Sequence, residues 1–597
     1  MKRKILWMLM SCLLVVSLVL ASCAKEEVVA PGEQEEEEEV VTPGEEEEEE
    51  EVVVPKAGEP QYGGKVIYFY QMGTSAGGAD MVDMGRGTGI WYATAVVEHL
   101  MRGNVEKYGP RGTNEYGFGN SWVVPYKFLT GALAESWDLS IDSIVFHIRP
   151  GVYWTGESIN PGVMEGPREY TADDCVFNLR RLYNSPRGSG LVGAGFIKTP
   201  VEKTIYAADK YTVVIETSRY NSEWWWLLNG WGTDQYPPEV VEAGAMDYNN
   251  LIGTGPWIMK EYVPSSYVSF KRNPNYWRKT TINGKEYEIP FIDELVNPVI
   301  ADESTVIAAL RTGKIDLDQQ ARPVYMESLP SELLTAPVSG FQSVFSMRAD
   351  KGPFADKKIR QAAMMGADLP AIAKAVYTEA YWYSWPVSEG SPGYIPLEEL
   401  PASTRELYKY NPKKAREIIL DAYPDGFTVE VTTKDMIDLV EAAEMLSAQW
   451  SKIGITLKIN VIDYSAFSNL QTTYGGWGDM IMGGGMPSLP LTILRGSYGH
   501  GGWGGSNGAM WFDESFIEKL NQASETIDPV ELDAILRELN LITKDECLYI
   551  PIGEPIYRCC WWPWIKNYWG EVNDIGITQP PMAQVWLDKD LKAKMGY

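Results

Sequence analysis

A helix followed directly by a strand is the feature of this sequence that most limits its fold. Between Met436 and Asp463, apolar residues recur at helical spacing, namely Leu439, Ala443, Leu446, Trp450 and Ile453. Gly454 is expected to end the helix, because glycine readily adopts the left-handed conformation found at helix ends. Residues 455–462 then alternate between apolar and polar side chains, as strands do. A helix that returns at once into a strand predicts an α/β lobe.

Shorter patterns predict further helices and strands. Residues 65–72 are rich in β-branched and aromatic side chains. Residues 143–154 alternate between apolar and polar side chains and are bounded by turn residues. Both segments therefore predict strands. Thr171 with Asp174 three positions later forms the pattern of a capping box at the start of a helix. In residues 411–412, asparagine followed by proline predicts another helix start.

The N-terminus has the pattern of an export signal. Residues 1–23 begin with three basic side chains, continue with a short apolar stretch and end in small residues. The last four, LASC, resemble a bacterial lipobox, in which Cys23 receives a diacylglyceryl group and becomes the new N-terminus. We therefore predict a lipoprotein signal peptide and an extracytoplasmic protein that is tethered by lipid to a membrane, either in the periplasm or on the outer face of the cell membrane. An ordinary signal peptide or a retained helix is the alternative.

Residues 24–60 form an acidic spacer. They hold sixteen glutamates against two lysines and have no apolar face, which predicts an extended, disordered linker. Of the formal net charge of −29, the signal contributes +3 and the linker −14, so −18 remains on the rest of the chain. A domain this acidic is unsuited to nucleic acid, whose phosphates require a basic surface.

The remaining chain is large enough for two to four domains, since 45% of the sequence is hydrophobic and no second long apolar run interrupts it. Its cysteines are few. A hairpin turning near residues 553–555 would place Cys547 opposite Cys559 or Cys560, so a disulfide between Cys547 and Cys560 is one expectation for an exported chain. Buried free thiols are the other.

Seven phrases occur along the mature chain in a fixed order. They cover residues 133–157 together with 170–182, then 253–257, 273–277, 309–317, 354–368, 410–420 and 451–459. In this order they resemble the family 5 extracellular solute-binding proteins of ABC importers, a group that includes oligopeptide-, dipeptide-, nickel- and some oligosaccharide-binding proteins. Any one phrase alone is weak, whereas seven in order are specific.

The resemblance implies an α/β fold of the type II periplasmic-binding-protein kind, with two lobes, a hinge of two strands and an extra subdomain in lobe 1. We expect the strand crossings near Leu295–Ile300 and Met480–Gly485. Lobe 1 would then comprise residues 61–298 and 485–597, with a subdomain at about residues 91–181, and lobe 2 would comprise residues 299–484.

The resemblance also implies a function. The protein is expected to be a monomer that captures a small solute, an oligopeptide or an oligosaccharide, between its lobes. Because ligand contacts both lobes only when they close, binding would shift an open–closed equilibrium. ABC permease subunits would recognise the closed form. A relative without a permease, serving as a ligand-sensing surface lipoprotein, is an alternative.

The nature of the solute depends on one departure from the family pattern. Peptide-binding members usually carry an aspartate after the returning strand, where it holds the peptide's α-ammonium. This chain has residues 483–486, three glycines and a methionine, at that place, and Asp479 comes too early. Flat rings are abundant instead, and they can stack on sugar faces or on side chains of an atypical peptide. The candidate ligand-binding residues are Trp225, Trp231, Trp382, Trp385, Trp477, Met486 and Trp503. Some of these rings belong to the core, because neighbouring residues point to different faces.

Catalysis is not expected, although two phrases fit the GxSxG pattern of serine hydrolases. The phrase at residues 504–508 has no histidine after it, and the phrase at residues 73–77, which contains Ser75, is followed by glycines rather than by a helix. A glycosidase stays open on composition alone, since the chain has 81 acidic residues.

No cofactor and no metal are expected. The three histidines, His99, His147 and His500, are isolated in the sequence. The sulfurs of Met480, Met482 and Met486 could bind copper, but packing in a core is the simpler interpretation.

Overall fold

The computed structural model describes residues 58–70, 78–80, 82, 89–120, 123–185, 196–230, 232–472, 475–485, 488–499, 507–573 and 581–597. The predicted signal peptide with Cys23, and residues 24–57 of the predicted linker, lie outside these ranges. Among the helices in these ranges, none combines the length and the apolar character needed to span a membrane.

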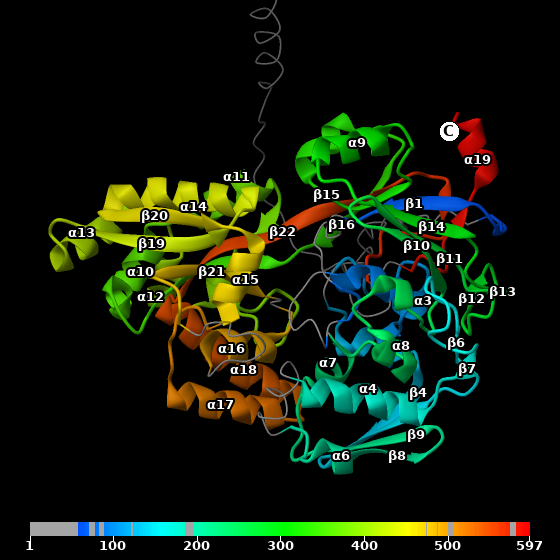
Figure 1. The fold of residues 1–597 in the computed structure, drawn as a ribbon. Coiled ribbons are helices and arrows are strands. Elements are labelled where there is room, and N and C mark those ends of the chain that lie inside the picture. The colour runs from blue at the N-terminus through cyan, green and yellow to red at the C-terminus, as the bar shows by residue number, and fades with distance from the viewer. Residues whose placement is uncertain are drawn as a thin grey trace, which may run out of the picture. The chain divides into compact units, whose positions relative to one another are not determined.

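One large mixed sheet runs through the molecule, with the strand order β10-β11-β14-β1-β15-β22-β17-β21-β19-β20 (Figure 1). Its first-lobe strands are β1 (Lys65–Phe69), β10 (Trp257–Val263), β11 (Tyr267–Arg272), β14 (Glu294–Pro298), β15 (Leu317–Ala321) and β16 (Leu334–Ser339). Its second-lobe strands are β17 (Gln342–Met347), β18 (Ala380–Tyr381), β19 (Phe427–Lys434), β20 (Ile455–Ile462) and β21 (Met480–Gly485). The long strand β22 (Tyr549–Trp561) belongs to both lobes, and both β16 and β18 pair with it.

The first lobe carries further small sheets and its own helices. Its small strands are β2 (Met101–Gly103), β3 (Leu129–Gly131), β4 (Ala134–Leu139), β5 (Ser143–Ile148), β6 (Tyr153–Trp154), β7 (Arg168–Glu169), β8 (Ile205–Asp209), β9 (Thr212–Glu216), β12 (Lys279–Ile282), β13 (Lys285–Glu288), β23 (Ile565–Lys566) and β24 (Trp586–Leu587). Its helices are α3 (Val105–Tyr108), α4 (Ala172–Asn184), α6 (Val201–Thr204), α7 (Trp224–Asn229), α8 (Pro238–Ala243), α9 (Glu303–Arg311) and α19 (Lys589–Lys594).

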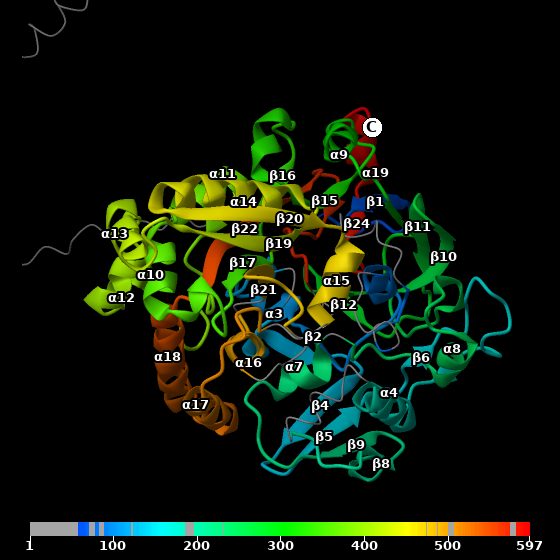
Figure 2. The same ribbon diagram turned by 60° about the vertical axis from the view of Figure 1, so that its left-hand side comes forward.

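Helices cover both faces of the second-lobe strands. They are α10 (Lys357–Met365), α11 (Leu369–Tyr377), α12 (Ala402–Leu407), α13 (Pro412–Ala422), α14 (Ile437–Trp450), α15 (Tyr464–Thr472), α16 (Pro490–Tyr498), α17 (Glu514–Glu525) and α18 (Pro529–Glu546). Figure 2 shows α11 and α14 on one face and α16–α18 on the other. Each face has its own apolar core, so the second lobe is a layered α/β unit.

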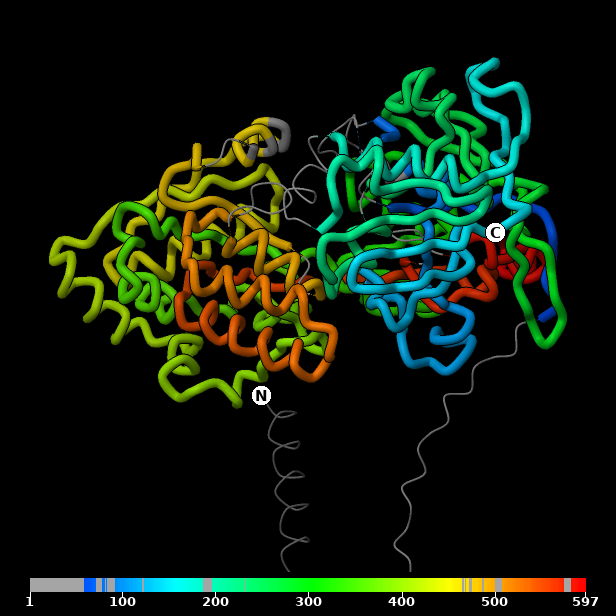
Figure 3. The backbone as a smooth tube through the Cα atoms, turned by 90° about the horizontal axis from the view of Figure 1, so that it is seen from below, coloured from blue at the N-terminus to red at the C-terminus, as the bar shows by residue number. Residues whose placement is uncertain are grey.

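Two passages of the chain connect the lobes. Val338 of β16 packs in the core of the first lobe, whereas Phe345 of β17 packs in the core of the second. In the same way, Ile552 of β22 belongs to the second core and Cys559 to the first. The segment after β22 stays in the first lobe, where Figure 3 shows the red C-terminal segment beside the blue and cyan ones. These two passages are the two-strand hinge of the fold.

The passages differ from the crossings expected at Leu295–Ile300 and Met480–Gly485. β14 pairs with β1 and β11 inside the first lobe, and β21 pairs with β17 and β19 inside the second. Consequently residues 303–338 pack with the first lobe, and residues 491–499 and 507–549 pack with the second, which differs from the expected ranges 61–298, 299–484 and 485–597. Buried central strands and crossing strands look alike in a sequence, because both are short apolar runs.

The subdomain of the first lobe also extends further than residues 91–181. Its four-stranded sheet has the order β4-β5-β9-β8, and two of these strands follow α4 in the chain. β9 pairs with β5 although helix α4 separates them in the chain, and no local sequence pattern predicts such a pairing.

The predicted helix–strand unit is confirmed. α14 ends at Trp450, Gly454 takes the left-handed conformation at φ 93°, and β20 begins at Ile455. Leu439, Ala443, Leu446 and Trp450 are buried on one face of α14. β20 then pairs in parallel with β19 over its whole length.

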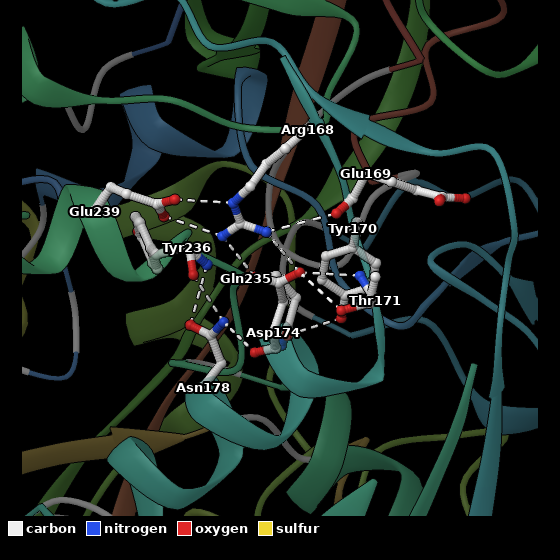
Figure 4. Close-up of polar contacts among 9 residues, drawn as sticks. All are labelled: Arg168, Glu169, Tyr170, Thr171, Asp174, Asn178, Gln235, Tyr236 and Glu239. Atoms are coloured by element: carbon white, nitrogen blue, oxygen red, sulfur yellow. Dashed lines mark hydrogen bonds and ion pairs between the residues drawn. The ribbon is translucent and has the colours of Figure 1, made fainter. Parts of the chain in front are cut away.

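The predicted helix starts are confirmed as well. Asp174 accepts a hydrogen bond from the backbone N–H of Thr171 at 2.9 Å, which completes the capping box of α4 (Figure 4). The side chain of Asn411 caps α13 by accepting from Lys414 N at 3.1 Å.

The predicted hairpin between Cys547 and Cys560 is wrong. β22 continues through Gly553, which has φ +129°, without a turn, so Cys547 lies just before one end of the strand and Cys560 lies at the other end. Cys547 packs in the second core and Cys560 in the first, and all four described cysteines are free. Pro551, Gly553 and Pro555 are residue types typical of turns. In this protein they lie where β22 passes from one lobe to the other.

Candidate functional site

The lobes touch where the first turn of α16 meets a loop of the first lobe. Glu223 accepts hydrogen bonds from the backbone N–H of Leu491 at 3.0 Å, the N–H of Thr492 at 2.9 Å and the hydroxyl of Thr492 at 2.6 Å. The first N–H groups of a helix have no partner within the helix, and Leu489 before α16 supplies no side-chain cap. A carboxylate of one lobe therefore caps a helix of the other. We call this contact the cross-lobe cap.

Two more contacts follow the same seam between the lobes. Ser222 N donates to Ser524 O at 2.8 Å, and the Arg219 guanidinium lies 2.9 Å from the carboxylate of Glu525. Glu223 itself is buried, which raises the pKa of its carboxyl, while the hydrogen bonds from Thr492 and Leu491 lower it. A buried carboxylate needs such partners, so the cross-lobe cap is the most protected contact of this seam.

Along one of its two edges, β21 is paired with another strand over only part of its length. On one side it pairs with β17 over its whole length, from Met480 to Gly485. On the other side β19 pairs only with Met480 and Ile481. From Met482 to Gly485, no strand of the described structure occupies that edge. Three of these four residues are glycines, which allow another backbone to approach closely.

Four residues on neighbouring strands form what we call the polar row: Tyr381, Glu554, Gln342 and Gly485. Tyr381 of β18 is paired with Glu554 of β22, and Gln342 of β17 is paired with Gly485 of β21. Gln342 and Glu554 are neighbours, because the adjacent positions on their strands form the pair Ser343–Gly553. Residues paired across strands point to the same face of a sheet, so the row lies on one face.

The face of the polar row is the one that α16 covers. A Cβ atom added at Gly485 would meet the side chains of Ile493 and Trp385. On the opposite face, a Cβ atom at Gly553 would meet Ala373 of α11. The polar row therefore lies on the same side of the sheet as α16, the helix whose end the first lobe caps.

Two side chains of the row are buried without full hydrogen bonding. Gln342 is 0% and Glu554 is 6% exposed. Ser384 Oγ donates to Gln342 Oε1, but within the described structure neither Gln342 Nε2 nor Glu554 Oε2 has a partner. Burial raises the pKa of Glu554 to about 7, and the hydrogen bond from Ser384 lowers it only in part. Such groups are rare in folded proteins and call for a partner.

Trp385, a predicted ligand-binding residue, is packed in a core of the second lobe. Its indole N–H donates to the hydroxyl of Tyr498 at 3.2 Å. Its backbone oxygen accepts from Nζ of Lys544 at 2.6 Å, and this Nζ lies 3.7 Å from the ring centroid of Tyr383. Burial lowers the pKa of Lys544 to about 7. The lysine thus holds the segment around Trp385 in place from inside the lobe.

The other described tryptophans among the predicted residues are also enclosed to a large extent. The indole N–H of Trp477 donates to Gly508 O at 3.0 Å, and Trp225 lies 6.3 Å from the ring of Tyr126. Both tryptophans are buried, whereas Trp382 is half-buried. No described contact assigns any of them to a ligand, so their binding role stays a prediction. Trp231, Met486 and Trp503 lie outside the described residues.

The sequence carries no clear signal for Glu223, Gln342 or Glu554. Glu554 stands between a glycine and a proline, a pattern that predicts a turn, and Glu223 precedes three tryptophans, which are more typical of a ligand-binding surface. An acidic residue inside the apolar run 548–561 is the one signal that could have singled out Glu554.

A pocket of about 350 Å³ lies along α4 in the first lobe. It is lined by Asp173, Val176, Phe177, Arg180, Arg181 and Asn184. Both arginines are engaged within the protein, Arg180 with two backbone oxygens and Arg181 with Asp80. All six lining residues belong to α4, so the pocket is separate from the seam between the lobes.

The described residues give no support to a metal site or to a catalytic serine. Among the described residues, no group of three or more His, Cys, Asp and Glu side chains is placed to hold a metal ion. Met480 and Met482 pack in the second core. Ser75 and residues 504–506 of the second GxSxG phrase lie outside the described residues.

Comparison with a protein-family model shows to which family the chain belongs. Residues 129–504 match the model described as bacterial extracellular solute-binding proteins, family 5 middle. The chain belongs to this family. The match includes residues of both lobes, whereas β22 lies outside it.

Curated relatives agree with this assignment. Heme-binding protein A of Haemophilus influenzae is 26% identical over 477 residues, which cover 73% of this chain and 81% of the relative. A dipeptide-binding protein of Pseudomonas aeruginosa is 26% identical over 451 residues, covering 71% of this chain and 80% of that protein. The relatives compared are thus binding proteins.

Solved structures confirm the fold. The periplasmic binding protein DppA of Helicobacter pylori, in complex with the peptide STSA, superimposes with a TM-score of 0.69 at 20% identity, covering 88% of this chain and 99% of that one. AgaA of an Agrobacterium (A.tumefacien R10), in complex with agropinic acid, gives a TM-score of 0.68 at 17% identity, covering 88% and 99%. The type II periplasmic-binding-protein fold with two lobes is therefore established for this family 5 protein.

Proposed function

We propose that this family 5 protein captures a peptide at the seam between its lobes and delivers it, as a monomer, to an ABC importer. The observation that carries the proposal is the open edge of β21 from Met482 to Gly485. An extended peptide can add to such an edge as an extra strand, using main-chain hydrogen bonds that suit many sequences.

The chemistry of the edge supports a peptide. Gly483, Gly484 and Gly485 leave the backbone accessible where a second backbone would pair. Their place beside the hinge also fits a ligand that is gripped when two lobes close. The names of relatives point the same way, since several are dipeptide- or di/tripeptide-binding proteins.

An oligosaccharide is the less favoured ligand. Sugar binding would need exposed flat rings on which sugar faces stack. Trp225, Trp385 and Trp477 are buried against their own protein, and only Trp382 among the described candidates retains appreciable exposure. Peptide binding without the family's usual aspartate therefore accounts for more of the observations.

We further propose the lipid tether at Cys23 and the spacer of residues 24–60 that holds the lobes away from the membrane. A basic start, an apolar stretch and the phrase LASC support the tether. Two acyl chains suffice for stable anchoring, whereas one does not. We infer no catalytic step, because the proposed site needs only binding and release.

Calorimetric titration with defined ligands tests the proposal. We expect mixed di- to pentapeptides to bind in the micromolar range, about −8 kcal/mol, and cello-, xylo- and manno-oligosaccharides not to bind. A matched pair, one peptide and its analogue with a methylated backbone nitrogen, tests strand pairing, because methylation removes a main-chain donor. Tight binding of an oligosaccharide, with no binding of any peptide, would contradict the proposal.

The tether has its own test. Mass spectrometry of the mature N-terminus is expected to find a diacylated Cys23, and the Cys23→Ala variant should move from the membrane to the soluble fraction. Recovery of an unmodified Cys23 in the mature protein would exclude the tether without touching the proposed binding site. Loss of peptide uptake on deletion of neighbouring permease genes would separate transport from ligand sensing.

A further inference from the structure

Leu489 belongs to the second lobe by its place in the chain, yet its side chain packs in the first. It stands directly before α16, whose residues Leu491, Ile493 and Leu494 pack in a core of the second lobe. Leu489 itself is 1% exposed and lies among the residues of the first-lobe core. Burial of an apolar side chain of this size is a substantial favourable contribution. Leu489 therefore joins the lobes through an apolar contact.

The cross-lobe cap lies beside this leucine. Glu223 of the first lobe binds the first turn of α16, which begins one position after Leu489. An apolar and a polar contact thus meet at the start of one helix. The Arg219–Glu525 pair of the same seam is partly exposed, so it adds little. We call Leu489 in the first core, together with the cross-lobe cap, the closure lock.

The closure lock lies away from the hinge. In two views that share a vertical axis, α16 and α7 lie side by side below β22, the strand of one hinge passage (Figure 1 and Figure 2). When two lobes rotate about a hinge, displacement grows with distance from the axis, so contacts far from it separate when the lobes open. Opening would expose Leu489 to water and would leave the first N–H groups of α16 without Glu223. The lock therefore opposes opening whether or not a ligand is bound.

The closure lock also follows closely on the proposed peptide edge. β21 ends at Gly485, and only three residues of the chain separate it from Leu489. The strand that would pair with a peptide and the residue that enters the first lobe therefore belong to one short segment. A peptide held along β21 would fix the segment that leads into the lock.

We propose that the closure lock, and not the ligand alone, sets the balance between the open and closed forms of this protein. With Leu489 and Glu223 in place, a large share of the ligand-free molecules is closed. The apparent affinity for a ligand scales with the fraction of molecules in the binding-competent form. The lock thus raises the affinity for every ligand by the same factor, whatever its side chains. This effect on affinity rests on the proposed peptide binding, whereas the effect on closure does not.

Small-angle X-ray scattering of the ligand-free protein tests the lock without any ligand. Leu489→Ala removes the apolar contact and Glu223→Gln weakens the cap. Both variants should show a larger radius of gyration than the wild type, and Leu489→Ala the larger increase. Leu494→Ala is the matched control, because Leu494 is a fully buried leucine of the same helix that packs within the second lobe. It should lower stability and leave the radius of gyration unchanged.

Calorimetry with two peptides of different charge, trialanine and trilysine, tests the consequence for affinity. Leu489→Ala should weaken both peptides by about tenfold, and Glu223→Gln should weaken both by about three- to tenfold. Leu494→Ala should bind both as the wild type does. The equal factor for the two peptides is the signature of a lock, since a residue that touched the ligand would distinguish them.

Two results would overturn the proposal. One is an unchanged radius of gyration in both lock variants, and the other is a loss of affinity confined to one of the two peptides. If the lock variants expand while the wild type binds neither peptide, the lock holds and the proposed function fails. Circular dichroism identifies a variant that has not folded, and the other lock variant then decides the test.

Discussion

Arg168 of the first lobe and Glu554 of the hinge both stand among polar side chains, yet only Arg168 has partners for its whole charged group. Its guanidinium donates to Asp174 at 2.7 and 3.0 Å and to Glu239 at 2.8 and 3.0 Å (Figure 4). Glu554 keeps one oxygen without a partner, and so does the amide nitrogen of Gln342 beside it. A closed network of this kind holds a fold together, whereas an open one leaves room for a ligand.

The Arg168 cluster, formed by Arg168, Asp174 and Glu239, ties three elements together. Arg168 belongs to β7, Asp174 to α4 and Glu239 to α8. Asp174 is 4% exposed and at the same time caps α4. Its role is complete without any further molecule, so changes there should affect stability and not binding.

The largest expected effect comes from Arg168→Met. The change leaves the buried Asp174 and the nearby Glu239 without their cation, which should lower the free energy of unfolding by about 3 to 4 kcal/mol. Urea denaturation measures this loss. Lys210→Met is the matched control, because the Lys210 side chain is 56% exposed and its loss should change stability by about 0.5 kcal/mol at most. A peptide affinity that fell in Arg168→Met while stability did not would break the comparison.

Glu554→Gln should change how stability depends on pH. The pKa of Glu554 is about 7 in the folded protein against an ordinary value of 4.5, so the folded state binds a proton here that the unfolded chain has released. The free energy of unfolding therefore falls as pH rises from about 4.5 to about 7. Relative to Glu554→Gln, the wild type should lose about 2 to 3 kcal/mol between pH 5 and pH 8.

Urea denaturation of both proteins at pH 5 and pH 8 measures this difference. Asp318, whose pKa is also raised by burial to about 7, contributes equally to both proteins and drops out of the comparison. Parallel pH dependence in wild type and variant would mean that Glu554 is not titrating in this range, and its contrast with Arg168 would disappear.

The cross-lobe cap is expected to give an intermediate effect. Glu223→Gln replaces the charged acceptor of three hydrogen bonds and should weaken the contact by about 1 to 2 kcal/mol. Hydrogen exchange at Leu491 and Thr492, whose N–H groups the cap protects, should speed up about five- to thirtyfold. Thr492→Val removes only the hydroxyl contact and should give a smaller change at Leu491. Unchanged exchange in Glu223→Gln would show that the cap does not hold the lobes.

The smallest effect is expected for Glu379→Gln. Glu379 and Arg558 form an ion pair at the hinge, but their side chains are 40% and 26% exposed. Exposed pairs contribute about 0 to 1 kcal/mol, so we expect a change in stability of about 0.5 kcal/mol or less by urea denaturation. A larger loss would place Glu379 among the groups on which the hinge depends.

Local elements could be read from the sequence with good accuracy. α14, the turn at Gly454 and β20 follow from periodicity and from one glycine. The caps by Thr171 and Asn411 follow from short motifs. In each case the interacting residues are neighbours along the chain, so the information needed is local.

Contacts between distant segments could not be read in the same way. The predicted crossings at Leu295–Ile300 and Met480–Gly485 are strands of single lobes, and the predicted turn at Gly553 is part of a continuous strand. Of the described tryptophans that looked like a binding surface, Trp225, Trp385 and Trp477 are packed inside the lobes. Aromatic residues serve a core and a ligand equally well, so their number alone does not decide their role.

What the sequence determined by itself is the kind of molecule: an acidic chain with an export pattern, α/β units and seven family phrases in order, matched by the family model over residues 129–504. Only the tertiary structure decided where the lobes join, which strand edge stays open and which buried groups lack partners. Glu223 binds the N–H of Leu491, and Glu554 lies beside Gln342 on the neighbouring strand, in each case across more than 200 positions of the chain. Whether a polar group is satisfied depends on what the fold brings to it, and no local pattern records that.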